Sequence, residues 1–111
     1  MNITRLLPII VTIVAMFLPE TIRAQEFGDV GMGRDFAVRF CASCHTVDER
    51  NTPSPEPAAS PFKAVADRPS TTRMALTAWL QSSHPTMPNL ILDSEEKSNV
   101  IAYILHLKDS P

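Results

Sequence analysis

The sequence predicts an all-α domain built from amphipathic helices, and two observations carry that prediction. Apolar residues recur at helical spacing in "GRDFAVRF", in "TTRMALTAWLQSS" and in "NVIAYILHLK". No strand-like alternation precedes the two cysteines, and a polar, proline-rich stretch, "RNTPSPEPAASP", follows the first helical segment. We therefore expect the chain to fold into helices that are joined by extended loops.

Residues 1–24 have the layout of a secretory signal peptide. The amino terminus and Arg5 are positively charged, and the apolar run "LLPIIVTIVAMFL" ends at Pro19, before a cleavage site after Ala24. The run is shorter than the ~20 residues that span a bilayer comfortably, although an uncleaved anchor is the alternative. We expect residues 25–111 to form one exported, periplasmic domain without a stable membrane span after cleavage.

The charge balance disfavours one class of partner. The chain has 10 Lys and Arg against 12 Asp and Glu, a net charge of -2, and no basic cluster, so we expect no binding to nucleic acid.

A domain this small buries a low fraction of its surface and usually needs a disulfide, a metal or a cofactor for stability. The cysteine pair is the candidate for that role.

Both cysteines lie beside a histidine in "FCASCH", as Cys41, Cys44 and His45. A disulfide that closes so short a loop would contribute little stability. A thioredoxin-like redox pair requires a βαβ context, whereas the segment before Cys41 has a helical pattern. A structural zinc site requires a second pair of ligands, and no second C-x-x-C or H-x-x-H pair is present.

The C-x-x-C-H pattern is the attachment signature of c-type haem. On one helical turn, the sulfurs of Cys41 and Cys44 can reach the two vinyl groups of one porphyrin, and His45 can bind the iron as proximal ligand. Such attachment occurs outside the cytoplasm, in agreement with the predicted signal peptide. The sequence therefore predicts one haem c, bound covalently through both cysteines.

A second axial ligand is expected, and a methionine sulfur is the usual choice where electrons are transferred. Met87 is the best candidate, because Pro85 and Pro88 hold it in a stiff, non-helical loop. Met32 is expected to precede the first helix, close to the cysteines, and would have to double back. Met74 lies in a helical pattern in which methionine usually fills space in the core.

Three other side chains have alternative interpretations. His84 could bind iron, but a lone loop histidine usually faces solvent, and His106 lies off the apolar face of the last helix. Trp79 precedes Met87 by eight residues. It is either an ordinary core residue or an aromatic that lies flat against the macrocycle.

The last helix is predicted to start at Ser94 as its N-cap and to cross the first helix at Gly33, which permits close approach. Its apolar face consists of Val100, Tyr103, Ile104 and Leu107, and that of the first helix consists of Phe36, Ala37, Phe40 and Cys41. The segment "PFKAVADR" is predicted to be a weak helix. The proline-rich loop before it is expected to wrap around the cofactor.

With these motifs in this order, the chain resembles a small bacterial class I c-type cytochrome. The resemblance runs through "GRDFAVRFCASCH", "SPFKAVADR", "ALTAWLQSSHPTMPNL" and "NVIAYILHLK". It implies N- and C-terminal helices packed crosswise around one covalently bound haem, with His45 and Met87 as axial ligands. It also implies that a proline carbonyl, assigned to Pro61, accepts a hydrogen bond from the proximal imidazole, and that Trp79 packs against the haem. Neighbouring prolines compete for the carbonyl role: Pro53, Pro55 and Pro57.

Two strong axial ligands would leave the iron without an open site, so we expect reversible Fe(III)/Fe(II) cycling. The sequence contains no paired carboxylates, nucleophile triad or phosphate loop that would indicate an enzyme. We expect a monomer that carries single electrons between redox protein partners. The alternatives are a dedicated electron-accepting subunit of a periplasmic dehydrogenase, and a haem-based gas sensor in which Met87 is displaced.

Overall fold

A computed structural model of the chain describes residues 27–82, 84, 87–88 and 90–110. The predicted signal peptide and its cleavage site lie outside the described residues. The described part contains four helices: α2 (Val30–Phe40), α3 (Phe62–Ala66), α4 (Arg73–Gln81) and α5 (Ser94–Leu107). It contains no strand, which confirms the all-α class. None of the described helices is long and apolar enough to cross a membrane.

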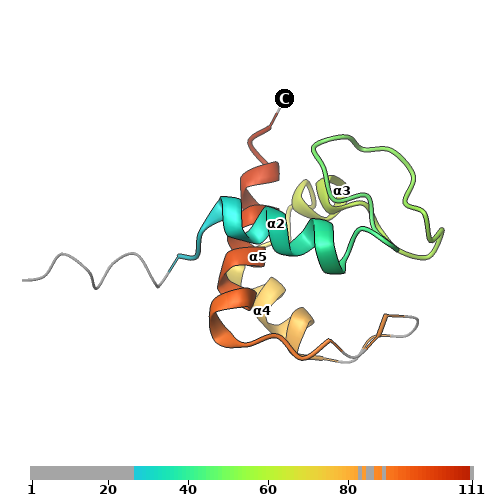
Figure 1. Ribbon diagram of the computed structural model, residues 1–111. Helices are drawn as coiled ribbons and strands as arrows, with labels where there is room; N and C mark the ends of the chain where they lie inside the picture. The colour runs from blue at the N-terminus through green and yellow to red at the C-terminus, as the bar shows by residue number, and fades with distance from the viewer. Residues whose placement is uncertain (1–26, 83, 85–86, 89, 111) are drawn as a thin grey trace, which may run out of the picture.

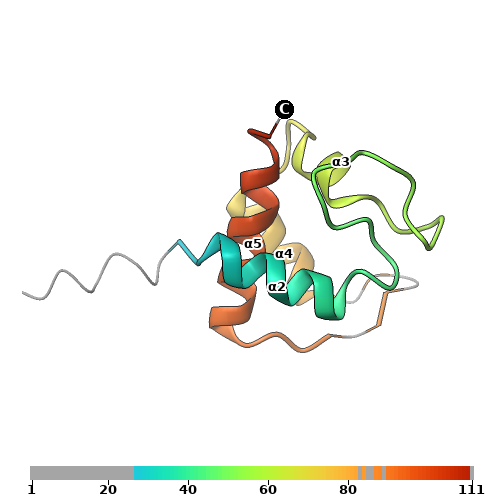
Figure 2. The ribbon, with the colours of Figure 1, turned by 45° about the horizontal axis from the view of Figure 1, so that its top comes forward.

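The first and last of these helices, α2 and α5, pack across each other (Figure 1, and Figure 2 after rotation). Gly33 lies at the crossing, as predicted. A Cβ atom on Gly33 would overlap the carbonyl oxygen of Asn99 and lie 2.9 Å from Cβ of Tyr103. The lack of a side chain at Gly33 therefore lets the two helices approach closely.

Side-chain caps fix where α2 and α5 begin. Asp29 caps α2, since its carboxylate accepts from the backbone N of Met32 at 2.7 Å. Asp93, rather than the predicted Ser94, caps α5. It forms a capping box with Glu96, in which each side chain accepts from the other residue's backbone N–H.

The core lies where α2, α3 and α4 pack on α5. Its buried members are Phe36, Ala37, Val47, Phe62, Ala66, Leu76, Val100, Ile101, Tyr103, Ile104 and Leu107. Phe40, on the same face of α2, is 52 % exposed, and its ring packs on that of Phe36. One sequence expectation fails here. Met74 is 82 % exposed, because the short helix α4 buries only Leu76 completely.

A buried hydrogen bond ties α5 to the loop that follows the cysteines. The Tyr103 hydroxyl donates to the carbonyl oxygen of Val47 at 2.6 Å. Burial raises the pKa of this phenol, since the charged form would lose its hydration. The bond keeps the segment after the cysteines against the core.

Candidate functional site: a haem-attachment cavity

The cysteines and the histidine lie on one turn that continues directly from α2. Cys41 is the C-cap of α2. Its carbonyl oxygen accepts from the backbone N of His45 at 2.9 Å and from that of Cys44 at 3.1 Å. The side chains of the three residues are therefore held together by local backbone hydrogen bonds, as the predicted helical turn requires.

The two cysteines do not form a disulfide with each other, and both are half-buried. Burial, with a smaller contribution from neighbouring Cys44, raises the pKa of the Cys41 thiol to about 11. Reactive redox cysteines have a lowered pKa instead. Among the described residues, no group of three or more His, Cys, Asp or Glu side chains could hold a metal ion. Neither the thioredoxin-like nor the zinc interpretation is supported by this environment.

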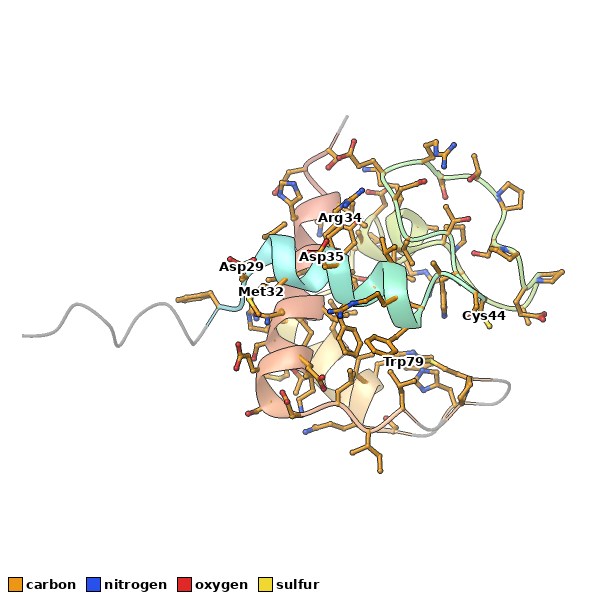
Figure 3. The ribbon with its side chains drawn as sticks, viewed as in Figure 1. Asp29, Met32, Arg34, Asp35, Cys44 and Trp79 are labelled. Atoms are coloured by element: carbon orange, nitrogen blue, oxygen red, sulfur yellow. The ribbon has the colours of Figure 1, made fainter. Side chains whose placement is uncertain are left out.

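A largely apolar cavity of about 500 Å³ opens beside this turn. Its walls come from the end of α2, the proline-rich loop, α3, α4, the segment after α4, and α5. In Figure 3, Cys44 lies beyond the end of α2, and Trp79 lies below the end of that helix in the view. The cavity brings together five of the six predicted site residues: Cys41, Cys44, His45, Trp79 and Met87.

His45 is oriented by one hydrogen bond and one ring contact. Its Nδ1 lies 2.7 Å from the carbonyl oxygen of Ser60, and because a carbonyl can only accept, Nδ1 carries the proton. The ring of Phe62 lies 5.3 Å away, centroid to centroid. Nε2 of the neutral ring consequently carries the lone pair, which is the form that binds metals.

The sixth predicted residue, Pro61, does not have the role that was assigned to it. The acceptor for the His45 ring is the carbonyl of Ser60, one residue earlier. The Pro61 carbonyl is occupied, because it accepts the first backbone hydrogen bond of α3 from Val65 at 3.0 Å. Pro61 is the N-cap of α3 and does not line the cavity.

Of the three methionines in the described part of the chain, only Met87 lines the cavity. Met32 lies in the first turn of α2, rather than before the helix as predicted, and is 54 % exposed, and Met74 points into solvent. The backbone N of Met87 donates to the carbonyl oxygen of His84 at 3.3 Å. The flanking Pro85 lies outside the described residues, so its predicted stiffening of the loop stays a prediction.

His84 lines the same cavity, contrary to the expectation that it faces solvent. Both of its ring nitrogens are buried and have no hydrogen-bond partner among the described residues. Its ring stacks on the indole of Trp79, with centroids 4.4 Å apart and planes at 35°. Trp79 itself lines the cavity and is 60 % exposed, so it is not an ordinary core residue.

The sequence did not identify two functional features of the wall. Ser60 could not be found from its residue type, since every residue has a carbonyl. Arg68 and Glu56 are the charged side chains among the described cavity-lining residues. The guanidinium of Arg68 donates to the Ser60 hydroxyl at 3.1 Å, which fixes a positive charge at the cavity wall.

The family model described as Cytochrome c matches residues 32–108. The chain belongs to the cytochrome c family. Over 80 residues it is 38 % identical to a protein named Cytochrome c-552 from Bradyrhizobium diazoefficiens, a match that covers 72 % of this chain and 76 % of that relative. No solved structure matches the chain. The family and the relative identify an electron-carrying cytochrome.

Members of the cytochrome c family bind haem c covalently, and the residues of this cavity fit that group. Two adjacent thiols lie at its wall, and the walls are mainly apolar, as a porphyrin face requires. An imidazole whose Nδ1 faces the Ser60 carbonyl, so that Nε2 is left for a metal, lies beside the thiols. Cys41 and Cys44 are the attachment residues of the C-x-x-C-H motif, and the partners that such a cytochrome implies are redox proteins.

Proposed function

We propose that this chain is a periplasmic carrier of single electrons, with His45 and Met87 as the axial ligands of its haem iron. The observation that carries the proposal is the shared cavity. It is lined by both attachment cysteines, by a histidine whose free nitrogen is Nε2, and by a single described methionine. Bound haem supplies a one-electron Fe(III)/Fe(II) couple.

The chain's own groups would tune this couple. The Ser60 carbonyl holds the proton on Nδ1 of His45, which fixes the ring orientation and makes the imidazole more electron-rich. The thioether of Met87 and the apolar walls favour the reduced state and raise the reduction potential. When haem is bound, Trp79 would pack against the macrocycle, and the guanidinium of Arg68 would be available to pair with a propionate.

Ligation by two side chains would leave the iron closed to substrates, which favours electron transfer over catalysis. The proposed location follows from residues 1–24, since a secretory signal peptide exports the chain. The mature protein should then have the mass of the polypeptide from Gln25 plus one haem. A larger mass that includes residues 1–24 would support the uncleaved anchor.

The ligand set is tested on the oxidised, purified holoprotein. The weak sulfur-to-iron charge-transfer band in the far red should be present, should disappear in Met87→Ala, and should persist in Met74→Ala. Met74 is a matched control, since it is 82 % exposed and its replacement should change the free energy of unfolding by less than ~0.5 kcal/mol. Persistence of the band in Met87→Ala would reject Met87 as the ligand.

A redox titration separates an electron carrier from the gas-sensor alternative. The holoprotein should titrate reversibly as a single one-electron couple, and the reduced form should not bind carbon monoxide at neutral pH. Rapid binding of carbon monoxide would instead indicate that the Met87 ligand is displaced readily, as a sensor requires.

A further inference from the structure

Ser60 accepts a hydrogen bond at two of its atoms, and the two donors belong to different parts of the cavity wall. Its carbonyl oxygen lies 2.7 Å from Nδ1 of His45. Its hydroxyl accepts from the guanidinium of Arg68, at 3.1 Å from Nη2. All three residues line the cavity. One serine therefore joins the charged side chain at the wall to the ring of the proximal histidine.

The bond between Ser60 and Arg68 connects the two ends of α3. Ser60 directly precedes Pro61, the N-cap of this helix, and Arg68 follows its last turn. The backbone of Arg68 is itself held in place, because its N–H donates to the carbonyl of Val65 at 3.3 Å and its carbonyl accepts from Thr71 at 3.0 Å. The arginine side chain is thus a brace that reaches back along the helix to Ser60.

The helix that carries this brace is fixed to the core. Phe62 and Ala66 are buried in the core where α3 packs on α5. The ammonium of Lys63 donates to the carbonyl oxygens of Leu107 and Ser110, both at 3.0 Å, at the end of α5. Arg68 therefore holds the Ser60 hydroxyl against a frame that does not move independently of the core.

Pro61 controls only one side of the peptide group that contains the Ser60 carbonyl. Its ring fixes its own φ at -56°. A residue before proline is confined to an extended range of ψ that still spans roughly 40°, so the carbonyl retains freedom to rotate on the Ser60 side. The hydroxyl extends from the same Cα atom as the carbonyl, through Cβ. Holding the hydroxyl in place limits the movement that the proline leaves open.

We propose that Ser60 is a positioning residue, through which Arg68 acts on the orientation of the His45 ring. The brace from Arg68 holds the Ser60 hydroxyl, and the Ser60 carbonyl in turn holds the Nδ1 proton of His45. A guanidinium has five N–H donors, so this role leaves Arg68 with donors for other partners. The proposal rests on His45 as an iron ligand, as given under Proposed function.

The test follows the Nδ1 proton of His45 by nuclear magnetic resonance in the reduced, diamagnetic holoprotein. In Ser60→Ala, this proton should exchange with solvent about fivefold faster, the factor expected when a side-chain hydrogen bond of typical strength no longer holds the acceptor. Its resonance should also move upfield, because the bond to the carbonyl lengthens, and a uniform loss of stability would not cause that shift. Ser60→Thr keeps the hydroxyl and should restore both values.

A double-substitution cycle shows whether the effect passes through Arg68. Arg68→Gln should change the exchange rate and the resonance of the Nδ1 proton as Ser60→Ala does, and combining the two substitutions should add nothing further. Ser70→Ala is the matched control, since it removes a hydroxyl from the same cavity wall and leaves the bond between Ser60 and Arg68 intact. That variant should match the unsubstituted protein.

Three results would overturn the proposal while leaving His45 as a ligand. An unchanged Nδ1 signal in Ser60→Ala means that the hydroxyl does not hold the carbonyl. Additive effects of Ser60→Ala and Arg68→Gln mean that the two side chains act independently. An equal change in Ser70→Ala means that any loss of polarity at the wall disturbs the ring. Failure of the ligand assignment itself has a different signature, because the ring C–H protons of His45 would then lack the large shift that the ring current of a bound haem produces.

Discussion

Replacing Gly33 with alanine should destabilise the protein by disrupting the crossing of α2 and α5. The backbone of Gly33 is helical, so its conformation is open to any residue, and the requirement at this position is for space. The new Cβ would overlap the backbone carbonyl of Asn99 and approach Cβ of Tyr103 to 2.9 Å. Neither atom can rotate away, since one is α5 backbone and the other is attached to it. The two helices must therefore move apart.

Two opposing effects set the magnitude. Alanine is favoured over glycine in a helix interior by about 0.5–1 kcal/mol. Inserting a methyl group into a tightly packed site costs about 1–3 kcal/mol, or more when the neighbours cannot relax. The separation would also strain two hydrogen bonds near the crossing, from Asp29 N to the Asn99 side chain at 2.7 Å and from Tyr103 to Val47 at 2.6 Å. We expect a net loss of about 2 kcal/mol in the free energy of unfolding.

Denaturant unfolding of the holoprotein, followed by far-ultraviolet circular dichroism, measures this loss. Gly31→Ala is the matched control in the same helix, because its Cβ would meet only the Asp29 carboxylate oxygen at 3.3 Å. We expect that variant to keep or slightly increase the stability. If Gly33→Ala were as stable as Gly31→Ala, the close approach of the two helices would not be a constraint on the fold.

Two further substitutions test the buried hydroxyl and the charged wall. Tyr103→Phe should cost about 1–3 kcal/mol in denaturant unfolding, because it leaves the carbonyl of Val47 without its hydrogen bond. Burial raises the pKa of the Tyr103 phenol in the folded state, so the unfolded chain releases this proton first, and stability should fall as the pH rises above about 10. The Tyr103→Phe variant should lack this fall in stability at high pH. If its stability varied with pH as that of the unsubstituted protein does, Tyr103 would not be the cause. Arg68→Gln should lower the reduction potential in a spectroelectrochemical titration, since it removes a positive charge that favours Fe(II). Arg50→Gln should not, because Arg50 is exposed, paired with Asp48 and outside the cavity lining.

The helices and the attachment turn could be predicted from the sequence because their signals are local. Apolar spacing identified α2 and α5, and the close approach at Gly33 followed from the missing side chain. The exact start of α5 was missed by one residue, although Asp93 and Glu96 carry the spacing of a capping box. Met74 shows where such patterns fail. A short helix such as α4 packs through few positions, and its sequence does not specify which of them face the core.

The environment of His84 could not be predicted, because burial of a loop side chain depends on contacts between distant segments. Its ring lies against that of Trp79 on α4, in the wall of a cavity that α2, α3 and α5 also line. The general preference of loop histidines for solvent was therefore a poor guide. The structure instead buries both ring nitrogens, without a hydrogen-bond partner among the described residues.

For the hydrogen-bond acceptor of His45, the family resemblance and the structure name neighbouring residues. The family resemblance associated the role with a proline, whereas the acceptor atom belongs to Ser60. The two statements are physically connected, since the Ser60 carbonyl is part of the peptide group that ends at the nitrogen of Pro61. The ring of Pro61 fixes φ at -56°, which limits rotation of that peptide plane, and the start of α3 at Phe62 anchors its other side. Pro61 thus contributes by orienting the carbonyl that precedes it, and its own carbonyl is left to begin the helix.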